Sequence, residues 1–167
     1  MPLHWADLVQ NPQLLGSLYS TVPPLKSARL RSFHLDWRGP TLTLRIDLPS
    51  YPENPPPAWS ELGHNALQVH LQFLAIDDLT VHGWIANTRV DMALSALPDR
   101  RLLTRISGRG LKFSFICSDS LTVGHISSFR PTASGSDHVM HSFLQHLDAR
   151  MFSSVPSTHE STFYERI

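Results

Sequence analysis

The stretch RLRSFHLDWRGPTLTLRIDLP, from Arg29 to Pro49, decides the fold class. In its first half Phe33, Leu35 and Trp37 alternate with polar residues. The second half alternates in the same way, with apolar residues at Leu42, Leu44, Ile46 and Leu48. A period of two predicts strands with one apolar and one polar face. Gly39-Pro40 separates the two runs, and glycine tolerates positive φ while proline fixes its own φ, so the stretch is predicted to be a β-hairpin.

Length and composition limit the class of protein. The 167 residues fit one domain with a core that needs no metal or disulfide support. Lys plus Arg and Asp plus Glu both number 14, and this balance argues against general nucleic-acid binding. The single cysteine, Cys117, allows no internal disulfide and favours a reducing compartment. No signal-peptide pattern or long apolar run is present, so we expect a cytoplasmic protein with no membrane partner.

The same alternation continues along the middle of the chain. It predicts further strands at 66–73, 79–84, 90–94, 102–106, 111–117 and 121–129, which with the hairpin make about eight. The connections are short, and parallel pairing would need crossovers of a dozen residues or more. The predicted fold is therefore mainly β (α+β by count): an antiparallel β-sandwich or a strongly curved antiparallel sheet.

Helices are predicted only near the two ends. Residues 5–19 have helical spacing broken by Asn11-Pro12, and Asn11 is expected to cap a short second helix. Apolar residues at three- and four-residue steps predict an amphipathic helix over 137–152. We therefore divide the chain into a β domain (1–131), a helical extension packed on it (132–152) and a flexible tail (153–167). The apolar stripe of the helix would cover either the sheet or a second molecule.

The tryptophans all adjoin predicted breaks in regular structure; they are Trp5, Trp37, Trp59 and Trp84. Rings of this size usually fill the ends of a core while the indole N–H reaches a loop carbonyl. The alternative is an exposed aromatic platform for a sugar or a partner. We favour core packing for all four.

No motif points to catalysis or to a cofactor. His138 and His141 could converge on an ion from one helix face, and His70 and His82 could face one another across strands. A zinc site needs three or four ligands, however, and no Cys partner or HExxH is present, so no metal is predicted and His138 with His141 stays a weak alternative. Cys117 is interpreted as a buried, inert thiol. GxSxG, P-loop and GxGxxG motifs are absent, which leaves a metal-dependent or hydrolytic enzyme as the least favoured interpretation.

A family resemblance extends over about residues 5–131. In sequence order Trp5, Asn11-Pro12, Leu18-Tyr19 and Pro23-Pro24-Leu25 precede the hairpin. A proline-rich loop ending at Trp59 follows, and then LQVHLQFLAIDDLTVHGW and LKFSFICSDSLTVGHISSFRP. This set resembles the immunity protein 50 family of bacterial polymorphic toxin systems.

The resemblance implies a non-catalytic cytoplasmic protein that binds a cognate protein toxin and inhibits it by occlusion. Polar alternation suggests which residues face the toxin: Asp36, Arg38, Arg45, Asp47, His70, Gln72, Asp77, Asp78 and His82. The alternative is a β-sandwich interaction module, for which the helix at 137–152 offers a homodimer contact. Monomer and homodimer both stay open.

Overall fold

The computed structural model describes residues 3–145, and its centre is one nine-stranded sheet in which every neighbouring pair is antiparallel. The strand order is β4-β7-β6-β5-β1-β2-β3-β8-β9. The strands are β1 (Ala28–Asp36), β2 (Thr41–Asp47), β3 (Ala66–Phe73), β4 (Asp77–His82), β5 (Thr88–Leu97), β6 (Arg101–Gly108), β7 (Leu111–Ser118), β8 (Leu121–Phe129) and β9 (Ser142–Phe143). Three short helical segments complete the described part: η1 (Trp5–Leu8), α1 (Gln13–Gly16) and α2 (Pro57–Glu61). The mainly β prediction is confirmed, in the form of a strongly curved sheet.

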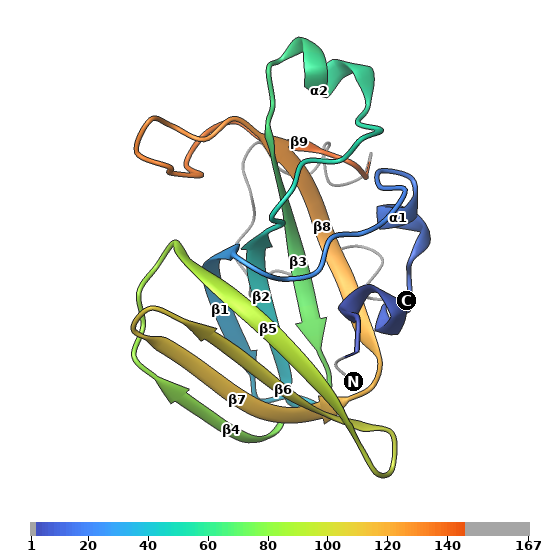
Figure 1. The fold of residues 1–167 in the computed structure, drawn as a ribbon, viewed down its shortest axis with the longest axis vertical. Coiled ribbons are helices and arrows are strands. Elements are labelled where there is room, and N and C mark those ends of the chain that lie inside the picture. Colours follow the sequence, from blue (N-terminus) through green and yellow to red (C-terminus); the bar gives the residue numbers. More distant parts are fainter. Residues whose placement is uncertain (1–2, 146–167) are drawn as a thin grey trace.

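The curvature comes from one short strand pairing. β1 and β5 pair only where Ala28–Leu30 meet Thr88–Val90, and beyond this point the two strands diverge. As a result β5, β6, β7 and β4 cross in front of β1, β2, β3 and β8 (Figure 1). The rings of Phe73 in β3 and Phe115 in β7 lie 5.1 Å apart, so the core fills the space between these two halves of the sheet.

The predicted hairpin is β1–β2. Phe33 pairs with Leu44 and Leu35 with Leu42, so these side chains share one face; Leu42 and Leu44 are fully buried, whereas Leu35 is 43% exposed. A register shift between Leu30 and Ser32 forms a β-bulge at Arg31. The side chain of Arg31 therefore lies on the other side of the sheet, where it bonds Asp47.

The N-terminal segment is attached to β8. Val9 forms a parallel bridge with Leu121, and the carboxamide of Asn11 donates to the Val123 carbonyl (2.8 Å) and accepts from its N–H (3.1 Å). Two short helices are present as predicted, but the expected N-cap at Asn11 is wrong. Pro12 occupies the cap position of α1, and no side chain bonds the cap. None of the helices in residues 3–145 is long and apolar enough to cross a membrane.

Asn11→Ala should lower the free energy of unfolding by about 1–3 kcal/mol, because a β8 donor and acceptor lose their partner. Urea denaturation followed by tryptophan fluorescence would measure this loss. Asn54→Ala is the control, since Asn54 is exposed and bonds the described part through its backbone N–H, to the Leu18 carbonyl, rather than through its side chain. Equal midpoints for the two variants would show that Asn11 does not anchor this segment.

The prediction of a helix over 137–152 is wrong for the residues that the structure describes. Residues 137–145 form a loop and β9, which pairs with the end of β8. Phe143 is buried as the spacing implied, but Met140 on the same predicted stripe is 80% exposed. Contacts with β8 and with a buried polar network outweigh the helical periodicity of this segment. The rest of the predicted helix and the tail at 153–167 lie outside the described residues.

Candidate protein-binding surface

Exposed apolar side chains gather at one corner of the molecule. Five of the eight exposed large hydrophobic residues in the described part come from two segments, 35–37 and 81–85. They are Leu35, Trp37, Val81, Trp84 and Ile85, and we refer to them as the apolar corner. Large exposed apolar patches on a folded protein commonly mark interaction sites.

A cluster of aromatic rings joins the two segments. Phe33 in β1 contacts Trp84, which follows β4, with ring centroids 5.0 Å apart and an edge-to-face angle of 63°. Phe113 in β7 lies 5.0 Å from Phe33 and is stacked with Trp84 at 6.3 Å. Each such pair contributes about 0.5–1.5 kcal/mol beyond burial, so these contacts stabilise the base of the apolar corner.

A close backbone approach fixes Trp84 and Ile85 on this base. Gly83 has a φ of +71°, and a Cβ there would overlap the carbonyl oxygen of Gly110. Gly110 has a φ of +75°, and a Cβ there would lie 2.6 Å from Cδ1 of Ile85. Only glycine fits either position without strain.

Trp37 projects from the turn between β1 and β2 and is 83% exposed. The turn is ordered by its neighbours: Asp36 accepts from the Arg38 N–H (2.9 Å), and its carboxylate lies 3.3 Å from the Arg38 guanidinium. The same guanidinium lies 5.9 Å from the centre of the Trp37 ring. These bonds to Arg38 also hold the pKa of Asp36 below its usual value.

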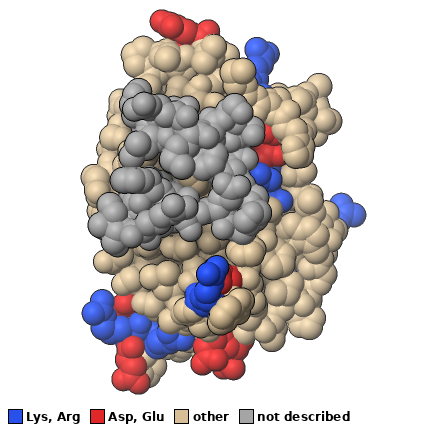
Figure 2. Space-filling model, turned by 180° about the vertical axis from the view of Figure 1, so that it is seen from behind, with Lys and Arg blue, Asp and Glu red and all other residues tan. Residues whose placement is uncertain are grey.

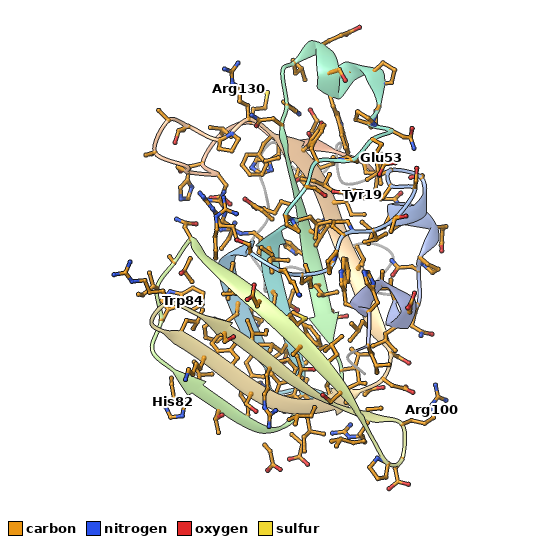
Figure 3. The ribbon with its side chains drawn as sticks, in the orientation of Figure 1. Tyr19, Glu53, His82, Trp84, Arg100 and Arg130 are labelled. Atoms are coloured by element: carbon orange, nitrogen blue, oxygen red, sulfur yellow. The ribbon has the colours of Figure 1, made fainter. Side chains whose placement is uncertain are left out.

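The predicted core position of the tryptophans is correct for Trp5 and Trp59, which are 3% exposed, and wrong for the other two. Trp84 is 41% exposed and lies at the edge of the sheet beyond His82 (Figure 3). Trp37 lies in a turn that extends past the core. The sequence does carry a signal for this, because Trp37 directly precedes Arg38 and the turn-forming Gly39-Pro40.

The nine residues suggested as toxin contacts do not form one surface. Four of them are exposed, namely Arg38, Asp77, Asp78 and His82, and two are half-buried, namely Asp36 and Gln72. Strands β1 and β4, which carry or adjoin most of these residues, adjoin the apolar corner. By contrast Asp47 is 7% and His70 2% exposed, and Arg45 is half-buried against Asp137. The expectation that the polar face of β2 and β3 is exposed is therefore wrong.

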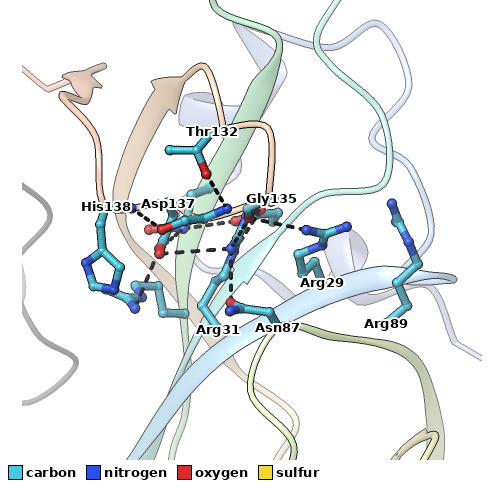
Figure 4. A network of polar contacts seen from close by, with 12 residues as sticks. Arg29, Arg31, Asn87, Arg89, Thr132, Gly135, Asp137 and His138 are labelled. Atoms are coloured by element: carbon cyan, nitrogen blue, oxygen red, sulfur yellow. Dashed lines mark hydrogen bonds and ion pairs between the residues drawn. The ribbon is translucent and has the colours of Figure 1, made fainter.

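Asp47 and Arg45 belong to a polar network centred on Arg31 (Figure 4), whereas His70 packs against His125 of β8. The Arg31 guanidinium donates to Asp47 at 2.6 and 3.0 Å, to Asn87 at 3.0 Å and to the Gly135 carbonyl at 2.8 Å. Gln68 donates to both Asp47 (2.9 Å) and Asp137 (3.0 Å). The loop that contains Gly135 and Asp137 thus covers this face, which explains why its polar pattern does not mean exposure.

Burial shifts the ionisation of this network and of His70. Burial alone would raise the pKa of Asp137, but the bond from Gln68 and the nearby Arg45 and Arg31 lower it overall. Burial, with His125 and Arg45 nearby, lowers the pKa of His70 to about 3. The imidazole of His70 is therefore neutral at physiological pH, and its Nε2 has no hydrogen-bond partner.

Stability should fall as the pH drops from about 6.5 toward 3. The unfolded chain protonates His70 near the ordinary value of 6.5, whereas the folded state does so only near pH 3. Asp137, with its lowered pKa, adds a further loss below its ordinary value of 3.8. Urea midpoints between pH 7 and 4 should vary less in His70→Phe than in the wild type. His82→Gln is an exposed control, and its urea midpoint should change with pH as in the wild type. If the midpoint of His70→Phe also changes with pH as in the wild type, His70 is not the source of the pH dependence.

The structure does not bring His70 and His82 together, and it gives His141 partners other than a metal ion. His70 lies beside His125 at 4.9 Å between ring centroids, while His82 is on β4 at the far edge of the sheet. His141 places Nδ1 2.8 Å from the Ser127 hydroxyl and Nε2 2.9 Å from the Asp137 carbonyl, so both nitrogens are engaged. No group of three or more possible ligands occurs in residues 3–145.

The Ser127–His141 pair resembles a nucleophile and its base, but its surroundings do not suit catalysis. Ser127 is 2% and His141 6% exposed, so a substrate has no access to either group in this conformation. Burial also lowers the pKa of His141. The pair holds the loop of Asp137 against β8.

Comparison with known proteins gave one result. The model of a family described as immunity protein 50 matches residues 11–128, which include β1 to β7, all but the last residue of β8, and the whole apolar corner. Neither the curated proteins nor the solved structures gave a match.

Proposed function

We propose that this chain, which belongs to the immunity protein 50 family, neutralises a cognate bacterial toxin by binding and occluding it, without catalysis. The family membership supports an immunity role, and the apolar corner supports binding as the way in which it is performed. The buried polar groups support the non-catalytic part, because Ser127 and His141 are closed off from solvent.

The observation that carries the proposal is the exposure of Trp37 on a turn that is closed by the bonds between Asp36 and Arg38. Tryptophan is enriched among the few residues that supply most of the binding energy in protein interfaces. An anchor that is already held in place loses little conformational entropy when it binds. Leu35 and the exposed residues of the second segment, Val81, Trp84 and Ile85, add apolar area that would exclude water from such a contact.

Titration of a purified toxin domain tests the proposal. The domain would be the C-terminal part of the protein encoded beside this gene. We expect inhibition of the toxin activity to be complete at one equivalent of this chain. Co-expression of the two proteins should restore growth. Full toxin activity at excess of this chain, together with no protection in cells, would overturn the proposal.

Self-association through the apolar corner is the competing use of the same surface. Light scattering at increasing concentration separates the two: a constant monomer mass supports a corner kept free for another protein. A dimer that dissociates on Trp37→Asp would assign the corner to a second copy of this chain instead.

A further inference from the structure

A hollow of about 630 Å³ lies on the outer face of the half-sheet formed by β4, β7, β6 and β5. Three cationic side chains line it, namely Lys26, Arg105 and Lys112, and all three are exposed. Among the lining residues Asp91 is the single carboxylate, and it accepts the Ser27 N–H at 2.7 Å. We call this surface the basic hollow.

The strand register explains why these cations project. Lys112 lies opposite Ser107, and Arg105 lies opposite Ser114 in β7 and Ala93 in β5. Residues directly opposite one another on a sheet have Cβ atoms about 5 Å apart, and diagonal neighbours such as Arg105 and Lys112 about 7–8 Å. Small neighbours cannot cover the charged groups, so two like charges are held on one face.

The cations of the basic hollow have no ion-pair partner among residues 3–145. The ion pairs of this part of the chain involve four other arginines: Arg31, Arg38, Arg45 and Arg100. From behind, by contrast, several Lys and Arg side chains adjoin Asp or Glu (Figure 2). Since the whole chain has equal numbers of both charges, the basic hollow is a local excess.

We propose that the basic hollow receives an acidic segment of the protein partner that the apolar corner binds. This rests on the proposed function. The two surfaces share β4: Thr80 and His82 line the basic hollow, and Val81 between them belongs to the apolar corner. A partner seated on Trp37 and Val81 that continues over the edge of β4 would reach the three cations. Electrostatic complementarity of this kind speeds association and rejects wrong partners.

A protein partner fits this hollow better than single-stranded nucleic acid. Sequence-tolerant binding of single strands needs aromatic rings on which bases stack. The one aromatic ring of Phe, Tyr or Trp that lines the basic hollow is Phe113, which is 2% exposed. The basic hollow itself therefore has charges but no stacking platform, and the exposed rings of Trp37 and Trp84 lie outside its lining.

NMR titration of the labelled full chain with a deca-glutamate peptide tests the basic hollow directly. Amide signals of β5, β6 and β7 near Ser107 and Ser114 should shift, and Arg105→Glu with Lys112→Glu should weaken binding by about tenfold or more. Arg130→Glu is the matched control, because Arg130 is exposed and outside the hollow. Any of three results would overturn the inference. The signal shifts could be confined to other strands, Arg130→Glu could weaken binding equally, or an oligothymidine could bind more tightly than the peptide.

Toxin inhibition separates this inference from the proposed function. The double charge reversal should raise the inhibitory concentration at low salt and have less effect at high salt, since screening weakens exposed charges. If the wild type inhibits the toxin and the double charge reversal inhibits it equally well, the inference about the basic hollow is overturned and the proposed function stands. A wild type that fails to inhibit would overturn the proposed function, and the peptide titration would then decide about the basic hollow by itself.

Discussion

Arg31→Ala is expected to lower the free energy of unfolding by about 3–5 kcal/mol, a large share of the roughly 5–15 kcal/mol of a typical domain. The Arg31 side chain is 1% exposed and neutralises Asp47, whose side chain is 10% exposed. Its removal leaves that carboxylate buried without its cation and frees the Gly135 carbonyl that Arg31 bonds. Urea denaturation at pH 7 would measure the loss.

Arg38→Ala is the control for this prediction. Arg38 also pairs with an aspartate, Asp36, but its side chain is 74% exposed. Exposed pairs contribute about 0–1 kcal/mol, so its loss should barely change the midpoint. A similar small effect for Arg31→Ala would mean that the buried network does not stabilise the fold.

Trp37→Asp should weaken toxin binding by about 2–4 kcal/mol, which is roughly 30- to 1000-fold in Kd. The change removes the most exposed ring of the apolar corner and puts a charge where the partner would exclude water. Folding should be unaffected, because Trp37 is 83% exposed and belongs to a turn. Calorimetry of the complex would measure Kd, and urea denaturation would check stability.

Met140→Asp is the matched control, since Met140 is 80% exposed but lies outside the apolar corner. It introduces the same charge on an equally exposed apolar residue and should leave Kd within about twofold. If Met140→Asp weakens binding as much as Trp37→Asp does, then the apolar corner is not the anchor.

The strands could be predicted from the sequence because each has a strong period of two. The hairpin, the eight longer strands and the antiparallel pairing all follow from alternation and short turns, and the structure confirms them. β9 was missed because two residues are too few to show a period.

The exposure of each face could not be predicted in the same way. Alternation tells which residues share a face, but not what else covers that face. Asp47 is buried because a loop far along the chain, around Asp137, bonds Gln68 beside it, and His70 is buried where it packs against His125 of β8. The bulge at Arg31, which places its charge beside Asp47, breaks the simple alternation of β1.

The binding surface was only partly predictable for a related reason. The polarity of Asp77, Asp78 and His82 predicts that they are exposed, and their strand does adjoin the apolar corner. Trp37 and Trp84 were assigned to the core because large rings are usually buried. Their exposure depends on where the sheet curves and ends, and this follows from the short β1–β5 pairing rather than from any local pattern.

Hydrogen exchange of the chain with and without the toxin domain tests the central claim most directly. We predict that binding slows amide exchange in residues 33–37 and 77–85, with the added protection extending into β6 and β7 around Arg105 and Lys112. The N-terminal segment and α2 should exchange at the same rate in both states. Protection confined to those last two regions, with none at the apolar corner, would contradict the account.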